Sequence, residues 1–210
     1  MILVFTAALA ACGRTAQNSS TAQSGSTGTT GSAAGNAADS TSDGKQNTGS
    51  GKTLVVYFSC TGNTKGAAET IAQVTGGELY AITPSQTYTD ADLNYNDKSS
   101  RSTTEQNDKS ARPGIDGSID SWAQYGTVYV GYPVWWGEEP RIMDTFAEKY
   151  DFTGKTVIPF CTSGSSDIGQ SGSNLAKLAG GSGRWLDGKR LATGASTGDV
   201  TDWISSLGLD

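Results

Sequence analysis

Short apolar runs alternate with longer, more polar segments along residues 52–210. Five runs are short enough to be strands and are rich in aliphatic and aromatic residues, namely 53–58, 78–83, 127–132, 156–161 and 184–186. Because strands that alternate with helical segments build a parallel sheet covered on both faces, the pattern predicts an α/β fold. Pro159 is unfavourable in the fourth run, since proline has no N–H for a ladder hydrogen bond.

Helical signals fall between and after these runs. The segment 63–74 is followed by two glycines, and the segment 140–149 begins with proline and carries one apolar stripe. A third helix is predicted to begin at Ser196, where Ser-x-x-Asp reads as a capping box. Residues 88–113 are polar and show no periodicity, so we predict a long loop there, of the kind that often forms a functional lid.

The N-terminus has the pattern of a secretory signal. Residues 1–11 are apolar and uncharged, but a helix needs about 20 residues to cross a bilayer. Leu9-Ala10-Ala11-Cys12 resembles the lipobox of bacterial lipoproteins, in which the chain is cut before a cysteine whose thiol carries a diacylglycerol. The resemblance implies a lipid anchor to the cell membrane on its extracytoplasmic side. The alternative is that Cys12 is merely a small apolar residue.

Residues 13–51 consist mainly of Gly, Ser, Thr and Ala and contain no aromatic residue. Such a segment buries too little surface to offset its ordering entropy, so we predict a disordered tether. The predicted organisation is therefore a signal-peptide remnant over 1–11, the lipobox cysteine and linker over 12–51, and one folded domain over 52–210.

Composition excludes several function classes. The formal charge of −6, from 15 basic and 21 acidic residues, gives no sign of the basic patch that a nucleic-acid binder needs. The chain has no histidine and three cysteines. This excludes a Ser-His-Asp triad, a His-ligated metal site and a four-thiolate zinc site. We therefore expect no nucleic-acid partner, no metal and no catalytic triad.

The first candidate loop, residues 59–65, joins the first strand to a helix. It brings several hydroxyls and the amide of Asn63 together around the bare backbone of Gly62. Helix-start N–H groups and the helix dipole favour a phosphate at such a position. The loop matches neither the P-loop nor the GxGxxG pattern. The alternative is an ordinary helix cap made of Ser and Thr.

Two further loops follow the central strands. In residues 132–140, Trp135 and Trp136 are adjacent, and neighbouring side chains diverge, so we expect at least one to be exposed beside the first loop. An aromatic wall next to a phosphate site suggests a ligand with a flat ring and a phosphate. The alternative is that both tryptophans anchor the next helix. Residues 161–169 are small, polar and glycine-rich, and they form either a close backbone contact to a ligand or a solvent loop.

Three stretches, LVVYFSCTGNTK, GYPVWWGEEP and GKTVIPFCTSGSS, resemble the FMN-contacting loops of the flavodoxin family, in its lipoprotein branch. The resemblance implies a flavodoxin-like three-layer sandwich, with helices on both faces of a five-stranded parallel sheet in the order 2-1-3-4-5. It also implies FMN as the cofactor. The residues that it implies for FMN binding are Ser59, Thr61, Gly62, Asn63 and Thr64 at the phosphate, with Cys60 as a variant in the same loop, Pro133, Val134, Trp135, Trp136 and Gly137 beside the isoalloxazine, and Thr162, Ser163 and Gly164 on its other side.

In that strand order Cys60 follows the first strand and Cys161 ends the fourth strand. These two strands are two positions apart in the sheet, and neighbouring strands are separated by about 4.8 Å. This separation is beyond the reach of a disulfide without distortion of the backbone. We predict two free thiols, with Cys161 in the core.

Our leading interpretation is an FMN-binding one-electron carrier, because the sequence supplies no acid, base or nucleophile for a substrate and the flavin does the chemistry. The acidic surface predicts redox partner proteins with basic docking surfaces. One alternative is an FMN-dependent NAD(P)H:quinone or flavin reductase. Arg101, Lys109 and Arg112 are the one basic cluster that could bind the phosphates of the dinucleotide. The alternative for these three residues is that they are solvated charges. A second alternative is a flavin-free interaction module at the cell surface.

Overall fold

The computed structural model describes residues 51–209. The predicted signal segment, Cys12 and most of the predicted linker lie outside the described residues and stay predictions. Within the described part of the chain, no helix combines the length and apolar character that a membrane crossing requires.

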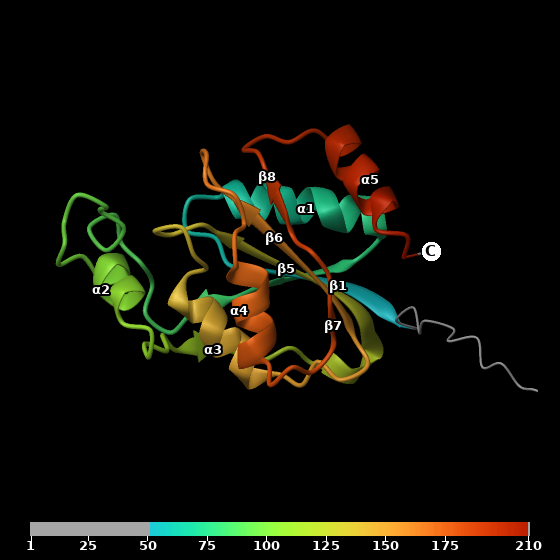
Figure 1. Cartoon of the computed structure of the whole chain (residues 1–210), viewed down its shortest axis with the longest axis horizontal. Helices are drawn as coiled ribbons and strands as arrows, with labels where there is room; N and C mark the ends of the chain where they lie inside the picture. The colour runs from blue at the N-terminus through green and yellow to red at the C-terminus, as the bar shows by residue number, and fades with distance from the viewer. Residues whose placement is uncertain (1–50, 210) are drawn as a thin grey trace, which may run out of the picture. The chain divides into compact units, whose positions relative to one another are not determined.

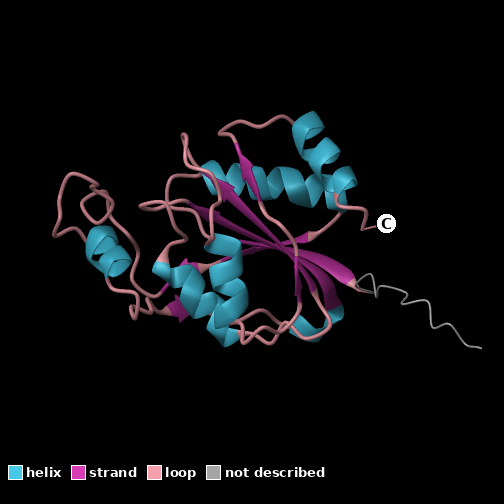
Figure 2. Ribbon diagram, in the orientation of Figure 1, coloured by secondary structure: helices cyan, strands magenta, loops and turns pink. Residues whose placement is uncertain are grey.

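A parallel sheet forms the centre of the folded domain (Figures 1 and 2). The strands lie in the order β2-β1-β5-β6-β7, and β8 also pairs with β6. Their bounds are β1 (Lys52–Tyr57), β2 (Glu78–Ala81), β5 (Tyr125–Pro133), β6 (Thr156–Thr162), β7 (Arg184–Trp185) and β8 (Lys189–Leu191). The predicted order 2-1-3-4-5 is confirmed, with the fifth place divided between two short strands.

The buried character of the central strands explains why they read as unbroken apolar runs. Every residue of β6 is buried, and Leu54, Val55 and Val56 of β1 are at most 1% exposed. Helices cover both faces of a parallel sheet, so both sets of alternating side chains lie in a core. β2, in contrast, is mostly exposed and lies at the edge, as its alternating pattern predicts.

Pro159 lies in β6 without breaking the sheet, because the neighbouring edge strand is interrupted beside it. The Val157 carbonyl accepts a hydrogen bond from Leu186 N at 2.9 Å. The backbone groups of residues two apart in a strand point toward the same neighbouring strand, so the Pro159 nitrogen points to the same side as the Val157 carbonyl. Pairing of β6 with β7 ends at Val157 and resumes with β8 at Phe160. The position without an N–H therefore faces the gap between the two short strands.

Two helical layers cover the sheet (Figure 1). The helices α1 (Asn63–Thr75) and α5 (Thr197–Ser206) pack on one face, and α3 (Arg141–Lys149) and α4 (Ser171–Leu178) pack on the other; a 3-10 turn, η1 (Trp122–Gln124), precedes β5. The sequence pattern missed α4, since it begins Ser-Gly-Ser and Leu175 is its one fully buried apolar side chain.

The segment 88–113, which we call the insertion, is not the uninterrupted loop that its pattern predicts. It contains the helix α2 (Arg101–Asn107), whose first turn is capped by Ser100 and whose side chains Arg101 and Glu105 form an ion pair at 2.6 Å. All seven residues of α2 are polar, so no apolar periodicity reveals it. The short strands β3 (Thr83–Pro84) and β4 (Ile115–Asp116) pair antiparallel at the base of the insertion.

Candidate functional site

A cleft of about 440 Å³ lies at the carboxyl ends of β1, β5 and β6, where the three candidate loops meet. In open α/β sheets this is the edge at which ligands bind. The predicted residues that line it are Ser59, Cys60, Thr61, Asn63, Thr64, Pro133, Val134, Trp135, Thr162, Ser163 and Gly164. Three predicted residues, Gly62, Trp136 and Gly137, are not among its lining residues.

The N-terminus of α1 opens onto this cleft without a cap of its own. Gly62 takes the N-cap position in the left-handed conformation, with φ 89°, and no side chain caps the helix. The nearby side chains bond within the loop instead: Ser59 Oγ accepts from Gly62 N at 3.2 Å, and Thr61 Oγ1 accepts from Asn63 Nδ2 at 3.3 Å. The backbone N–H groups of the first turn are thus left for an anionic ligand.

A buried hydroxyl pair joins the first loop to the third. Thr64 Oγ1 and Thr162 Oγ1 are 2.8 Å apart, and both residues are at most 4% exposed. One hydroxyl donates its proton to the other, so the second hydroxyl keeps a proton for another acceptor. This pair fixes the start of α1 against the end of β6, and it retains one donor that can serve a ligand in the cleft.

The two tryptophans diverge, as predicted, at a tight turn. Trp135 and Glu138 exchange backbone hydrogen bonds of 2.9 and 3.0 Å, and the two residues between them have positive φ, 49° at Trp136 and 83° at Gly137. This backbone resembles a type I′ turn, where glycine is well suited to the second central position but tryptophan is strained in the first. Trp135 is 3% exposed, whereas Trp136 is 41% exposed.

Aromatic contacts give the two tryptophans different roles. Trp135 packs edge-on against Phe58 and Tyr88, with ring centroids 5.7 and 5.3 Å away, and closes the floor of the cleft. Trp136 lies outside the cleft and packs on Tyr95 of the insertion at 4.8 Å. Trp135 is therefore buried in the cleft wall, whereas Trp136 is partly exposed and contacts the insertion.

The insertion supplies cleft residues that the sequence did not reveal. Asp90, Leu93 and Tyr95 line the cleft, as do Ser165 and Ser166 at the far end of the third loop. The length of the insertion was the one signal that pointed to such a role. Asp90 carries the only charge among the cleft-lining side chains in the described part of the chain.

The two cysteines within the described residues are free, as predicted. Cys161 is fully buried, and burial raises the pKa of its thiol to about 12. A thiol in that state is a packing group rather than a nucleophile. Cys60 is exposed and lines the cleft.

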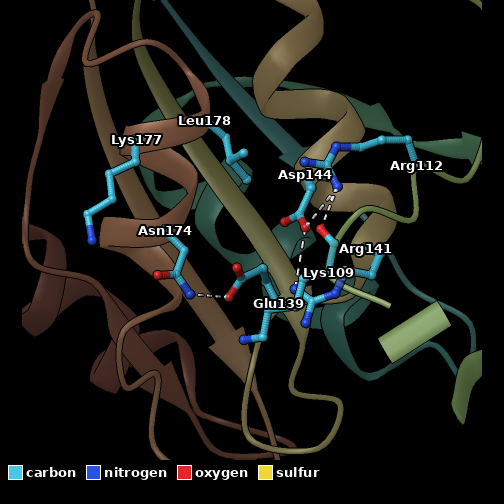
Figure 3. A pocket seen from close by; sticks show the side chains of 8 residues that line it. All are labelled: Lys109, Arg112, Glu139, Arg141, Asp144, Asn174, Lys177 and Leu178. Carbon is cyan, nitrogen blue, oxygen red and sulfur yellow. Dashed lines mark hydrogen bonds and ion pairs between the residues drawn. The ribbon is translucent and has the colours of Figure 1, made fainter. Parts of the chain in front are cut away.

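A second cleft, of about 250 Å³, contains three buried charged side chains, those of Glu139, Arg141 and Asp144 (Figure 3). It lies along α3 and α4 and is lined by Lys109, Arg112, Glu139, Arg141, Asp144, Asn174, Lys177 and Leu178. Arg141 contacts Asp144 at 3.3 Å and donates to the Gln106 carbonyl of α2 at 3.1 Å. Burial and the nearby Glu139 carboxylate together raise the pKa of Asp144 to about 6, against the opposing effects of Arg141 and Arg112. We interpret these charges as the link that holds the insertion against α3.

The basic cluster expected for a dinucleotide does not face the first cleft. Arg101 pairs with Glu105 at 2.6 Å, Lys109 with Glu138 at 2.9 Å, and Arg112 with Glu148 at 2.8 Å. None of the three basic residues lines the first cleft. Their charges are thus balanced by carboxylates of this domain.

Comparisons with known proteins agree on one family. The sequence profile of the flavodoxin family matches residues 52–207. The crystal structure of a candidate flavoprotein from Bacteroides uniformis is 47% identical, with a TM-score of 0.70 over 74% of this chain and 98% of its own. One from Bacteroides eggerthii is 42% identical, with a TM-score of 0.71 over 76% of this chain and 99% of its own.

A more distant structure is that of a flavoprotein from Lactobacillus acidophilus in complex with FMN. It is 26% identical, with a TM-score of 0.52 over 67% of this chain and 93% of its own. No curated protein matches the chain.

Proposed function

The chain belongs to the flavodoxin family, and from this premise we propose that it binds FMN in the first cleft, carries single electrons and is tethered by Cys12 to the outer face of a bacterial membrane. The observation that carries the proposal is the uncapped N-terminus of α1, which opens into a cleft with aromatic side chains in its wall.

The residues of the cleft suit a ligand with a phosphate at one end. The free N–H groups of α1 and the hydroxyls of Ser59, Thr61 and Thr64 would hold the phosphate. These donors are neutral, so they bind a dianion by hydrogen bonds and the helix dipole rather than by an ion pair. The Lactobacillus acidophilus flavoprotein, whose structure contains FMN, supports the choice of this flavin.

The rest of the cleft suits a flat ring. Val134 and Trp135 from the second loop and Leu93 and Tyr95 from the insertion would lie against the isoalloxazine. Ser163 and Gly164 would provide polar contacts from the third loop. Bound FMN supplies one-electron and two-electron chemistry, and the protein sets its binding, orientation and electrostatic surroundings.

A carrier is favoured over a reductase by the charges. Arg101, Lys109 and Arg112, the one basic cluster considered for a dinucleotide phosphate, are each paired with a carboxylate and do not line the cleft. The formal charge of −6 favours partner proteins with basic docking surfaces, which long-range attraction would bring to the domain.

A reductive titration distinguishes the carrier from the reductase. We expect the FMN-loaded protein to accept electrons from dithionite in two separate one-electron steps and to show negligible oxidation of NADH or NADPH with a quinone as acceptor. Rapid turnover of NADH or NADPH would favour the reductase, and a colourless protein that does not bind added FMN would favour the flavin-free module.

The tether is tested separately. When the protein is expressed with a complete signal in a bacterium, mass spectrometry is expected to show acyl chains on Cys12, and Cys12→Ser is expected to lack them. Recovery of unmodified wild-type protein from the culture medium would contradict the anchor.

A further inference from the structure

The central part of the third loop, residues 163–166, is held in place by a side chain from a neighbouring strand. We call these four residues the third cleft loop. Gly164, Ser165 and Ser166 are exposed, and Ser163 is half-buried. Within the loop, Ser163 Oγ donates a hydrogen bond to the Ser166 carbonyl. An exposed loop of small residues has little packing to hold it, so external contacts decide its conformation.

Arg190 provides those contacts. It lies on β8, opposite Cys161 in the parallel register with β6. Its Nε donates to Ser163 Oγ at 3.1 Å, and its Nη2 donates to the Gly164 carbonyl at 3.1 Å. Because the guanidinium is planar and rigid, two bonds from its fork fix the start of the loop relative to the sheet.

Within residues 51–209, the charge of Arg190 is not neutralised by an ion pair. Among the described residues, no carboxylate lies within ion-pair distance of this guanidinium, in contrast to Arg112 and Arg141. Arg190 lowers the pKa of the Cys161 thiol, but burial and the Asp167 carboxylate raise this pKa and have larger effects. Among the described residues that line the cleft, Asp90 is the one with a charged side chain.

We propose that Arg190 is a positioning residue for the third cleft loop and that its positive charge, which no ion pair neutralises among the described residues, raises the reduction potential of the flavin held there. The inference rests on the proposed function. Reduction adds negative charge, which the acidic domain opposes and a nearby cation favours. Arg190 therefore limits how low the potential of this flavodoxin falls.

Three variants separate the positioning role of Arg190 from the effect of its charge. Arg190→Gln removes both the charge and most of the fork, and Arg190→Lys keeps the charge but loses the two-bond geometry. Lys189→Gln is the matched control, because it removes the same charge from the neighbouring residue, whose side chain points to the opposite face of the sheet. Each protein is compared in hydrogen exchange of residues 163–166 without flavin, in affinity for FMN and in midpoint potential.

We expect faster exchange of residues 163–166 in both Arg190 variants and an affinity for FMN about tenfold weaker in Arg190→Gln, as for the loss of a charged hydrogen bond. The midpoint potential is expected to fall in Arg190→Gln and to stay near the wild-type value in Arg190→Lys and Lys189→Gln. Equal exchange and equal potential in Arg190→Gln and Lys189→Gln would overturn the proposal.

The exchange measurement needs no flavin, so it distinguishes the two ways of failing. If the wild-type protein binds no FMN, the proposed function fails, and unchanged exchange in Arg190→Gln then refutes the positioning role as well. If FMN binds normally and Arg190→Gln changes neither potential nor exchange, only the role of Arg190 is refuted.

Discussion

The helices α1 and α5 both begin in short, polar sequences, Gly-Asn-Thr-Lys and Ser-Thr-Gly-Asp, but their N-termini are capped differently. At α5, Ser196 and Asp199 form a complete capping box, which satisfies the backbone N–H groups of these two residues. At α1 no side chain caps the helix, and its first turn has no acidic residue. The comparison teaches that one end stabilises the fold, whereas the other leaves its donors free at the cleft.

The two helices also differ in the charge of their third residue. It is Asp199 in α5 and Lys65 in α1. A carboxylate near a helix N-terminus interacts favourably with the dipole, and a lysine there does not. α1 thus lacks a local source of stability, and an anionic ligand would supply the missing negative charge.

The largest expected effect comes from placing a carboxylate at the first residue of each helix. Asn63→Asp puts a negative charge where the phosphate is proposed to bind, and we expect FMN affinity to fall by more than about tenfold. The flavin-free protein is expected to gain about 0.3–1 kcal/mol from the dipole. Thr197→Asp at α5 is the matched control, expected to leave affinity unchanged. Titration calorimetry and urea unfolding measure the two quantities, and equal affinities in both variants would remove α1 from the site.

The hydroxyl pair that ties α1 to the third loop comes next. Thr64→Val leaves the buried Thr162 hydroxyl without its partner, and we expect a loss of about 1–3 kcal/mol in the free energy of unfolding. Removing both hydroxyls, in Thr64→Val with Thr162→Val, is expected to restore part of that loss. A double variant as unstable as the sum of the single variants would show that the hydroxyls do not interact.

Removing the cap of α5 is expected to act on stability alone. Ser196→Ala loses the side-chain acceptor for Asp199 N, which costs about 0.5–2 kcal/mol in such caps. FMN affinity should not change. Thr61→Ala at α1 gives the opposite pattern, with weaker FMN binding and little change in unfolding by urea. If Ser196→Ala and Thr61→Ala had the same effects on FMN affinity and on the free energy of unfolding, the N-termini of α5 and α1 would not differ in role.

The smallest expected effect is the pH dependence of the α5 cap. Hydrogen bonds from the Ser196 side chain and backbone hold the pKa of Asp199 below its usual value. The resulting stability is present above the unfolded-state pKa of about 3.9 and is lost as pH falls through the folded-state value. Asp199→Asn is therefore expected to lose less stability on acidification below about pH 4 than the wild type. Identical slopes in Asp199→Asn and the wild type would contradict this assignment.

The central strands and the three cleft loops were predictable from the sequence for local reasons, whereas the order of the strands was implied only by the resemblance to the flavodoxin family. The buried strands are unbroken apolar runs, and the loops that follow β1, β5 and β6 carry their residues within a few positions of each strand end. Parallel strands bring such loops together without any long-range information.

The contribution of the insertion was not predictable, because tertiary contacts set its path. Tyr88 packs against Phe58 and Trp135, and Gln106 of α2 donates to the Glu139 carbonyl at 2.9 Å. Neither contact leaves a periodic signal in a polar segment, and so Tyr95 could not be assigned to the cleft. The exposed position of Trp136 follows from the turn, whose backbone the sequence suggested only through Gly137.

The central claim is that the open end of α1 holds the phosphate of FMN, and the most direct test compares FMN with riboflavin, which lacks that phosphate. Both are titrated into the same flavin-free protein, with fluorescence as the measure of binding. We expect FMN to bind about a hundredfold or more tightly than riboflavin, since the phosphate adds more than one charged hydrogen bond. Equal affinities for the two flavins would contradict the claim.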